Sequence, residues 1–478
     1  MTHRARALRA LRVELAVCCA GFAVLIAGCT SSGAGPSTPS YTGPAPQPSN
    51  SSAPQSAAVG GPGEWITYNG GNTRQGVEIV AASGSPSAGA GSPAAPAIAW
   101  RARLDGAVYG QPLLVGDEVL AATENDSVYA LDRSGRVLWR ARLGTAQAQS
   151  GLKCGDIDPL GITSTMAYDP TTGSLFALAE TDGGHHTLFA LDPATGAVRW
   201  QRAAEPPEGS PIDTQQRAAL TVAFGRVYVP FGGLYGDCGD YVGSVVGTPT
   251  SGQGAQVAYS VPTAREGGIW APGGLVTVGS VLYAAVGNGA STTAFDGSAS
   301  VIALSPGLSR LDYFAPATWA QDNASDLDLG SLTPALVGGR IVALGKRGTA
   351  YLLAADRLGG IGGQIAQTQV CPAFGAAAVR GSLVYMACQD GVRAVEVTGN
   401  AIKVVWKSAG RADGSPTLSG GEVWAVDTAR GTLYRFDAAT GAVTGQVALG
   451  AVPHFASPAL GSGRAYVGTA NGVVAVTG

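Results

Sequence analysis

The residues of this 478-residue chain whose types and spacing are best suited to chemistry lie in Ile269–Gly289, which reads IWAPGGLVTVGSVLYAAVGNG. This stretch is typical of two short strands joined by a tight turn, and it opens on Trp270 and closes on Asn288. Gly287 and Gly289 flank the asparagine, and glycine lets a backbone come close to another group. Two interpretations are open: the two side chains serve packing and a turn, or they face a bound ligand.

Other chemical signatures are weak or absent. His185 and His186 resemble a metal-binding pair, but adjacent residues of a strand point to opposite faces, so we expect them to decorate a loop. No G-x-S-x-G, H-E-x-x-H or Walker motif occurs, so the usual parts of hydrolase and nucleotide-binding sites are missing. No C-x-x-C motif occurs either, which argues against a zinc knuckle and a covalently attached c-type haem.

The elements that must position these residues come from a repeat. The stretch QPLLVGDEVLAATENDSVYALDRSGRVLWRARL, from Gln111, recurs as SPTLSGGEVWAVDTARGTLYRFDAATGAVTGQVAL, from Ser415. Each copy is typical of four antiparallel strands separated by tight turns, and the later copies follow at a spacing of about 41 residues. Eight copies are expected, starting at or near Gln111, Gly161, Gln216, Trp270, Thr333, Phe374, Ser415 and Ser457.

The repeat predicts an all-β fold, an eight-bladed β-propeller of four-stranded antiparallel blades. The eighth copy ends at Gly478 before its outer strand. The stretch AIAWRARL, Ala97–Leu104, matches VLWRARL of the first copy, so we expect it to supply that strand. Pairing of the N-terminal and C-terminal strands would then close the ring and remove its exposed edges.

Several conspicuous residues recur with the repeat, and we expect them to be structural. An aspartate in the LDRSG, LDPATG and FDAATG turns caps each turn with its side chain, and a tryptophan ends an outer strand as a wedge between adjacent blades. The aspartates are Asp132, Asp192 and Asp437, and the tryptophans are Trp139, Trp200 and Trp406.

Charge and composition narrow the class of partner. The chain has 30 basic and 33 acidic residues, 71 glycines and only 13% charged residues. Removal of residues 1–28 takes away four Arg and one Glu, which increases the acidic excess. Nucleic-acid binding requires a basic surface, so we expect no nucleic-acid partner.

The N-terminus predicts export and anchoring. An arginine-rich start and a short apolar run indicate a signal peptide over residues 1–28. The residues LIAGC resemble the lipobox of bacterial lipoproteins, so Cys29 is the expected site of lipidation and the lipid membrane a partner; an ordinary signal peptide cut elsewhere is the alternative. Residues 29–63 then form the lipidated cysteine and a disordered tether, and residues 64–478 form the propeller. The expected location is outside the cytoplasmic membrane, anchored to the cell membrane by lipid.

Four cysteines remain in the exported part, which is an even number for an oxidising compartment. Cys371 and Cys388 flank a stretch that one hairpin-like excursion would bring together. The other pair is then Cys154 with Cys238. Two disulfides are therefore predicted.

The VYALD..SGRVLW repeat resembles that of the pyrroloquinoline quinone (PQQ) propellers, and the resemblance covers Glu64–Gly478. Three kinds of protein share it: quinoprotein alcohol dehydrogenases, the non-enzymatic lipoprotein propeller of outer-membrane assembly, and sensor or scaffold domains. The motifs GGIWAPGG, VGNG, DLDLGSLTPAL and GKRGTAYLLAADRLGG are similar to those of the quinoprotein dehydrogenases, most closely the polyvinyl-alcohol-dehydrogenase-like branch.

The resemblance implies roles for particular residues. Trp270 would form the floor under the planar cofactor and Asn288 would ligate calcium. Asp326 is the best match to the catalytic aspartate, with Asp328 second. The basic residue near the quinone oxygens would be Lys346, with Arg347 adjacent.

The sequence also departs from the dehydrogenases. The calcium-binding glutamate is replaced in YGDCGDYVGSVVG by Asp237 or Asp240, and the adjacent cysteine pair that lies over the cofactor is absent. The expected function is a ligand-binding or scaffold module of the cell envelope, with an envelope protein or a small molecule as partner. The alternative is a PQQ- and calcium-dependent alcohol dehydrogenase that passes electrons to an external acceptor.

Overall fold

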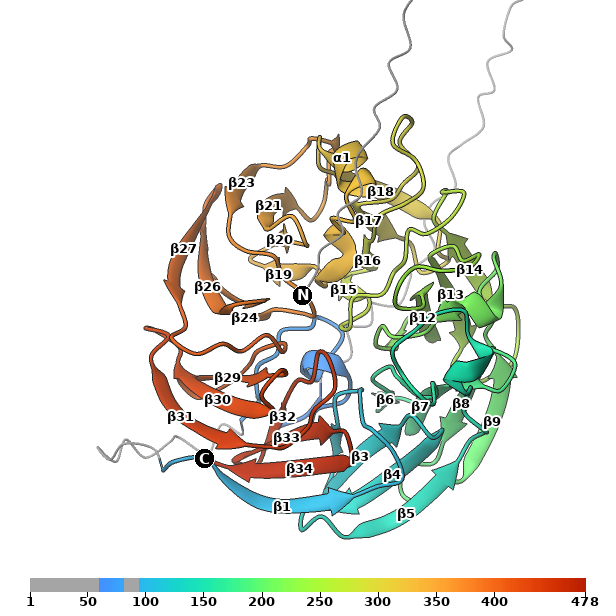
Figure 1. The fold of residues 1–478 in the computed structure, drawn as a ribbon, viewed down its shortest axis with the longest axis vertical. Helices are drawn as coiled ribbons and strands as arrows, with labels where there is room; N and C mark the ends of the chain where they lie inside the picture. The colour runs from blue at the N-terminus through green and yellow to red at the C-terminus, as the bar shows by residue number, and fades with distance from the viewer. Residues whose placement is uncertain (1–59, 81–93) are drawn as a thin grey trace, which may run out of the picture. The chain divides into compact units, whose positions relative to one another are not determined.

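A computed structural model describes residues 60–80 and 94–478 of the chain. The predicted signal peptide and the lipidation site Cys29 lie outside these residues. The described part forms eight antiparallel sheets arranged as blades around a central axis, which confirms the predicted eight-bladed β-propeller (Figure 1).

Within each blade the strands follow one another in chain order from the axis outward, except that the outer strand of blade 8 comes from the N-terminal side. Blade 1 is β2 (Leu113–Val115), β3 (Glu118–Thr123), β4 (Ser127–Asp132) and β5 (Val137–Arg142). Blade 2 is β6 (Ala167–Asp169), β7 (Ser174–Thr181), β8 (His185–Leu191) and β9 (Val198–Ala203). Blade 3 is β11 (Thr221–Ala223), β12 (Arg226–Gly233), β13 (Ser244–Pro249) and β14 (Val257–Ser260), with β10 (Thr214–Gln215) also paired to β12. Blade 4 is β15 (Val276–Val278), β16 (Val281–Val286), β17 (Ser300–Leu304) and β18 (Arg310–Ala315), with β22 (Gly360–Ile361) parallel to β18.

The remaining blades follow the same order. Blade 5 is β19 (Ala335–Val337), β20 (Arg340–Ala343), β21 (Thr349–Ala354) and β23 (Ala366–Gln369), and the helix α1 (Trp319–Ala324) precedes it. Blade 6 is β24 (Ala378–Arg380), β25 (Leu383–Cys388), β26 (Gly391–Thr398) and β27 (Ala401–Lys407). Blade 7 is β28 (Thr417–Ser419), β29 (Glu422–Asp427), β30 (Thr432–Asp437) and β31 (Val443–Ala448). Blade 8 is β32 (Ala459–Gly461), β33 (Arg464–Thr469), β34 (Gly472–Thr477) and the N-terminal strand β1 (Ala97–Arg103).

The two ends of the ring meet in blade 8. Strand β1 pairs antiparallel with β34, from Ala97 opposite Thr477 to Arg103 opposite Gly472. The outer strand missing from the eighth repeat is therefore supplied by the start of the propeller, as the sequence predicts. Blade 8 thereby has four strands, and its outer strand joins the start of the propeller to its end.

Tryptophans on outer strands join neighbouring blades, as predicted. The Nε1 group of Trp139 in blade 1 donates to the Pro193 carbonyl of blade 2 at 2.9 Å, and Trp406 in blade 6 donates to the Ala438 carbonyl of blade 7 at 3.1 Å. A Cβ at Gly196 would lie 2.4 Å from the Trp139 ring, so each wedge needs a glycine in the turn that it covers. The same arrangement recurs at Trp200 and at Trp100.

The turn aspartates also have the predicted structural role. Asp132 Oδ1 accepts hydrogen bonds from the backbone of Ser134 at 2.9 Å and of Arg136 at 3.1 Å. Asp192 and Asp437 accept equivalent bonds in their own turns.

The histidine pair lies in a strand rather than in a loop, so that prediction is wrong. Both residues belong to β8 and point to opposite faces: the His185 side chain is exposed and that of His186 is fully buried. His186 Nδ1 lies 3.0 Å from Glu205 Oε2, and its Nε2 lies 3.4 Å from Glu180 Oε2. The carboxylates raise the pKa of His186 to about 9 although burial alone would lower it. This histidine is therefore part of a buried ionic contact within blade 2.

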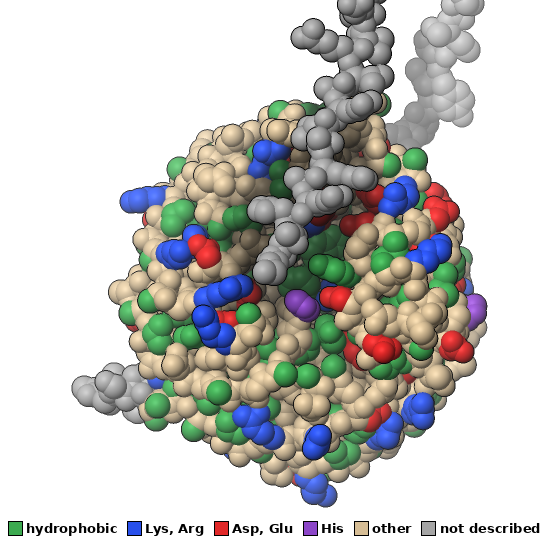
Figure 2. Space-filling model, viewed as in Figure 1, with side chains coloured by type: hydrophobic (Ala, Val, Ile, Leu, Met, Phe, Trp, Pro, Cys, Tyr) green, Lys and Arg blue, Asp and Glu red, His purple; other side chains and the backbone are tan. Residues whose placement is uncertain are grey.

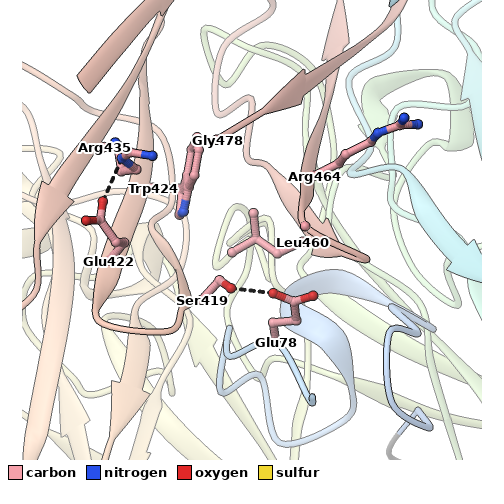
Figure 3. Close-up of a pocket in the computed structure, with 9 residues that line it drawn as sticks. Glu78, Ser419, Glu422, Trp424, Arg435, Leu460, Arg464 and Gly478 are labelled. Carbon is pink, nitrogen blue, oxygen red and sulfur yellow. Dashed lines mark hydrogen bonds and ion pairs between the residues drawn. The ribbon is translucent and has the colours of Figure 1, made fainter. Parts of the chain in front are cut away.

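A segment before the first blade, residues 64–79, crosses the axis and contacts inner strands around the ring. It exchanges backbone hydrogen bonds with Leu114 of blade 1, Thr277 of blade 4, Val379 of blade 6 and Leu418 of blade 7. Figure 1 shows it as the blue segment near the centre of the ring. At its far end Ser419 donates a hydrogen bond to Glu78, beside Leu460 of blade 8 (Figure 3).

Arg74 is the buried charge of this segment, with 2% of its surface exposed. Its guanidinium donates to the Leu220 carbonyl at 3.0 Å, to Thr221 Oγ1 at 2.8 Å and to the Leu275 carbonyl at 3.3 Å. Burial lowers its pKa to about 9. Neutral oxygens of blades 3 and 4 thus solvate a cation in place of water.

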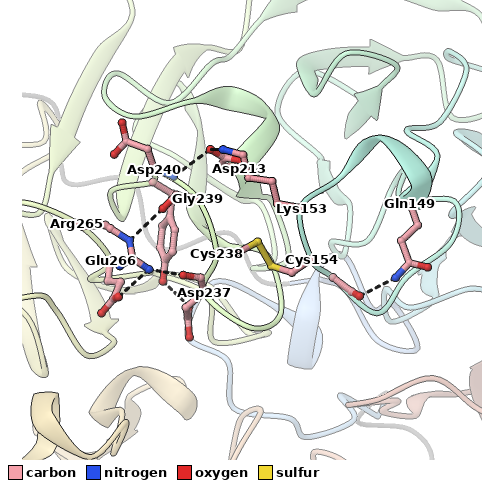
Figure 4. Close-up of a disulfide and its surroundings, with 12 residues drawn as sticks. Gln149, Lys153, Cys154, Asp213, Asp237, Cys238, Gly239, Asp240, Arg265 and Glu266 are labelled. Carbon is pink, nitrogen blue, oxygen red and sulfur yellow. Dashed lines mark hydrogen bonds and ion pairs between the residues drawn. A yellow bond between two sulfur atoms is a disulfide. The ribbon is translucent and has the colours of Figure 1, made fainter.

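Both predicted disulfides are present. Cys371 pairs with Cys388 at the end of β25, and Cys154 pairs with Cys238 across a sequence separation of 84 residues. The second disulfide links the loop that leads into blade 2 to a loop of blade 3, between β12 and β13 (Figure 4).

Substitution Arg74→Leu should lower the free energy of unfolding by about 3 kcal/mol or more, because it leaves several buried acceptors in two blades without a donor. Arg199→Leu, at an exposed position of the outer strand β9, is the control and should change stability by about 0.5 kcal/mol or less. Denaturant unfolding of both variants measures the difference. Equal midpoints for the two would contradict this role of Arg74.

Candidate functional site

A cavity of about 600 Å³ lies at the axis, lined by the loops that lead into the inner strands and by loops between second and third strands. Figure 2 shows a hollow near the centre of this face with hydrophobic and acidic side chains around it. The side chains that line it include charged, polar and aromatic groups: Asp156, Arg217, Asp237, Tyr241, Trp270, Asn288, Asp326, Asp328, Lys346, Phe374, His454 and Phe455. The cavity therefore gathers residues from most of the ring.

Blade 5 and the loop before it supply an ion-pair cluster. Lys346 Nζ lies 2.6 Å from Asp326 Oδ1 and 2.6 Å from Asp328 Oδ2. The backbone N–H of Asn288 donates to the other oxygen, Asp328 Oδ1, at 2.6 Å. The Asp328 side chain is 4% exposed and that of Asp326 is 63% exposed. Asp328 is therefore the inner carboxylate of the cluster and Asp326 the outer one.

Close approach explains the glycine before Asn288. A Cβ at Gly287 would lie 2.4 Å from Asp328 Oδ1 and 3.3 Å from Trp270 Nε1. Only glycine lets the carboxylate and the indole approach this backbone together. The tryptophan and the asparagine that bound the two strands of blade 4 thus face the same cavity.

Three aromatic rings form one apolar wall. The centroid of Trp270 lies 6.4 Å from that of Phe374 and 6.2 Å from that of Phe455, and the two phenylalanine rings are 6.2 Å apart. The rings come from the loops into blades 4, 6 and 8, so the wall spans the axis. Such a wall suits the flat face of an organic ligand.

Sequence reasoning missed an acidic residue at the site. The amide nitrogen of Asn288 donates to Glu266 Oε2 at 3.3 Å, and Glu266 forms a backbone bridge to Gly289. Asp237, which was predicted near Asn288, lines the same cavity and accepts a hydrogen bond from Tyr241 Oη at 2.5 Å. The signal that could have pointed to Glu266 is its position directly before the GGIW motif.

Burial sets the protonation of the carboxylates. It raises the pKa of Asp328, an effect that Lys346 and the Asn288 N–H oppose only in part. It also raises the pKa of Glu266, where neighbouring acids add to the shift although Arg265 opposes it. Burial alone would lower the pKa of Lys346, but Asp328 and Asp326 outweigh it and the net shift is upward.

Two predicted residues do not reach the cavity. Arg347 points to the helix α1, where it pairs with Asp322 and donates to Gln321 Oε1 at 3.2 Å. Asp240 is exposed, and Figure 4 shows its carboxylate directed away from Asp237 and Glu266. Each is close in sequence to a cavity residue, but its side chain points elsewhere.

Backbone conformation is unusual at this site. Four non-glycine residues in or beside the cavity have positive φ angles: Asp237 at 50°, Glu266 at 69°, Asp326 at 51° and Phe455 at 63°. Such residues cost free energy and often occur where side chains must be held in a particular place. Three of the four are acids, which indicates that the loops are shaped to present carboxylates.

The described part of the chain contains neither a preformed cage of metal-binding acids nor a membrane-spanning helix. Over residues 60–80 and 94–478, no group of three or more His, Cys, Asp or Glu side chains is arranged to hold a metal ion. In the same residues no helix is long and apolar enough to cross a membrane.

Substitution Lys346→Met should destabilise the protein by about 2–3 kcal/mol at pH 8, because it leaves the buried Asp328 without its cation. The folded-state pKa of Asp328 already exceeds its unfolded value, so its contribution to stability falls as pH rises between these values. Loss of Lys346 raises the folded pKa further. The destabilisation should therefore shrink as pH falls through the raised pKa of Asp328 in the variant, where this carboxylate takes up a proton.

Denaturant unfolding of the variant and the wild type between pH 5 and 9 measures this dependence. The double variant Lys346→Met/Asp328→Asn removes both charges and should recover most of the lost stability. A pH-independent difference that the double variant does not relieve would contradict the ion-pair explanation.

Comparisons with known proteins agree with this fold. Residues 69–292 match a PQQ-repeat family model described as outer membrane protein assembly factor BamB. No curated protein matches the chain. Among solved structures, quinohemoprotein alcohol dehydrogenase from Comamonas testosteroni has a TM-score of 0.65 at 17% identity, over 87% of this chain and 80% of that one.

Two further structures are similar at comparable identity. A europium-containing methanol dehydrogenase has a TM-score of 0.65 at 16% identity, over 87% of this chain and 98% of that one. BamB from Moraxella catarrhalis has a TM-score of 0.55 at 17% identity, over 80% of this chain and 97% of that one. Identities this low establish the fold and leave the activity open. Residues 69–292 thus match the PQQ-repeat family, and the eight blades agree with its propeller fold.

Proposed function

We propose that this protein binds a planar small-molecule ligand together with a hard metal cation in its axial cavity. The observation that carries the proposal is the convergence of Trp270, Asn288, Asp328 and Lys346 on one cavity of about 600 Å³, although they come from two blades and the loops between them. A packing role for Trp270 and a turn role for Asn288 do not require this convergence.

The donor set fits a hard cation. Asn288 uses its amide nitrogen on Glu266, and within residues 60–80 and 94–478 no donor is bound to its amide oxygen. Amide and carboxylate oxygens are the ligands that calcium and similar ions prefer. Four carboxylates line the cavity against two permanently charged side chains, Lys346 and Arg217, so an added cation improves the charge balance.

The organic ligand would lie on the aromatic wall. Trp270 and Lys346 both line the cavity, and the positive charge of Lys346 can bind a carbonyl oxygen of a ligand that lies on the tryptophan ring. A quinone of the PQQ type meets both requirements, and when bound with its metal ion it supplies hydride-accepting chemistry. The protein's own contribution is to orient the ring and to hold Lys346 charged.

A second candidate function is alcohol oxidation. The observation that supports it is the exposed Asp326 beside Lys346, a carboxylate that would act as the base for a bound alcohol. Two of the similar structures are named as an alcohol dehydrogenase and a methanol dehydrogenase. Alcohol-dependent reduction of an added electron acceptor would distinguish this enzyme from a pure binding module.

A scaffold for other envelope proteins is the remaining possibility within the non-enzymatic class. The description of the matching family model, an outer membrane assembly factor, supports it. A protein that only binds other proteins through its surface does not need a buried ion-pair cluster at its axis. The cavity therefore supports ligand binding over a scaffold role.

Terbium, a trivalent lanthanide like the europium named for one similar structure, is a sensitive probe of such a cation site. Wild-type protein should show saturable terbium luminescence excited through tryptophan, and calcium should displace it. Asn288→Ala and Asp328→Asn should weaken terbium binding at least 10-fold, because each removes an oxygen donor or its charge.

Asp240→Asn is the matched control, since it removes a nearby carboxylate outside the cavity and should leave terbium affinity unchanged. PQQ added to the calcium-loaded protein should then quench tryptophan fluorescence, and Trp270→Leu should abolish the quenching. Equal terbium affinity in the wild type, Asn288→Ala and Asp240→Asn would overturn the proposed metal site.

We also propose that the propeller acts outside the cytoplasmic membrane, anchored by lipid on Cys29. The lipobox-like sequence and the two disulfides support this location, because disulfides persist in oxidising compartments. Cys29→Ser should move the protein out of the membrane fraction or leave it unprocessed. A variant that stays membrane-bound with the same lipidated mass would contradict the anchor.

A further inference from the structure

Arg217 is a cavity residue whose charge the ion-pair cluster does not use. It lies in the loop between β10 and β11 that leads into blade 3, and it lines both the axial cavity and a smaller space beneath it. Its guanidinium carbon lies 5.3 Å from the ring centroid of Phe455 and 5.8 Å from that of Tyr109. These rings come from the loops into blades 8 and 1 and hold the guanidinium by cation–π contacts.

The guanidinium has no hydrogen bond or ion pair to any residue in 60–80 and 94–478. A guanidinium carries five N–H donors, and a half-buried one without an acceptor costs free energy. Burial lowers the pKa of Arg217, which the nearby Asp156, Glu124 and Tyr109 oppose, yet an arginine stays protonated at neutral pH. The charge is therefore present, and its N–H donors have no acceptor in the part of the chain that the structure describes.

The position of Arg217 gives the cavity two different ends. Lys346, Asp326 and Asp328 come from blade 5 and the loop before it. Arg217 contacts rings from blades 8 and 1, on the other side of the axis, where Asp156 and His454 lie 4.0 Å apart. Phe455 touches both ends, because its ring lies 6.2 Å from that of Trp270 and 5.3 Å from the guanidinium.

We propose that Arg217 binds the carboxylate of the ligand, so that the cavity selects a planar or aromatic carboxylate. This inference rests on the proposed binding of a planar ligand to the aromatic wall. The flat face of such a ligand lies along Trp270 and Phe455, and its carboxylate accepts two parallel N–H bonds from the guanidinium. The unused donors of Arg217 are then satisfied by the ligand.

Benzoate and benzamide provide a matched pair of probes, since they differ in charge but hardly in shape. Titration calorimetry on the mature chain should give at least 10-fold tighter binding of benzoate than of benzamide. Arg217→Gln should abolish this preference and Arg217→Lys should retain part of it. Arg226→Gln is the control, because Arg226 is in the same blade and binds carbonyls of β13 and the following loop, outside the cavity.

Several outcomes would overturn the assignment. Equal binding of benzoate and benzamide by the wild type, or a benzoate preference that survives in Arg217→Gln, would show that Arg217 does not select a carboxylate. Tight Arg217-dependent binding of phenyl phosphate without benzoate binding would replace the carboxylate by a phosphate. Thermal unfolding of each variant verifies that it is folded.

Failure of the metal site has a different signature. Absence of saturable terbium binding beside an intact, Arg217-dependent benzoate preference would overturn the metal part of the proposed function and support the carboxylate site. Saturable terbium binding with no benzoate preference would support the metal site and overturn the carboxylate site at Arg217.

Discussion

The ring depends on a segment that belongs to no blade. Residues 64–79 pass beneath the cavity and bond to inner strands that are hundreds of residues apart in the chain, with Arg74 solvated only by carbonyls and hydroxyls. A propeller blade otherwise contacts only its neighbours, so a common partner at the axis couples the blades. Tyr68 of this segment lines the small space below Arg217, and its hydroxyl donates to Ser415 Oγ at 2.8 Å. The segment thus makes the base of the cavity.

Above that base, loops form the cavity, and the strands of the blades hold the two ends of each loop in place. The disulfide between Cys154 and Cys238 packs with Leu234. It fixes the loop between β12 and β13 that carries Asp237 (Figure 4). Arg265 donates to the Asp237 and Gly239 carbonyls of the same loop. Covalent and polar links therefore hold a loop with little regular structure, which keeps its carboxylate at the cavity.

Repeats and motifs made part of the fold and of the candidate site predictable from the sequence, whereas contacts between distant loops were not. Blade number, ring closure, the Trp139 wedge and the Asp132 turn follow from local patterns that recur along the chain. Trp270, Asn288, Asp326, Asp328 and Lys346 were identified by motif, and all line one cavity. Arg347 was wrong because sequence adjacency does not fix side-chain direction. Glu266, Arg217 and the segment 64–79 were missed because their roles arise from contacts between distant loops, for which a single sequence has no local signal.

Ligand binding explains the charged groups of the cavity better than a contribution of these groups to the stability of the fold does. A buried ion pair repays its desolvation only when its geometry is very good, and apolar residues of similar size often stabilise a core as well. Here Lys346 balances Asp328 and Asp326, while Glu266 and Asp237 keep further negative charge nearby and Arg217 has no acceptor among residues 60–80 and 94–478. Positive φ angles at Glu266 and Asp326 add backbone cost in the same place. The costs that meet at this cavity are offset if a ligand with complementary charges occupies it.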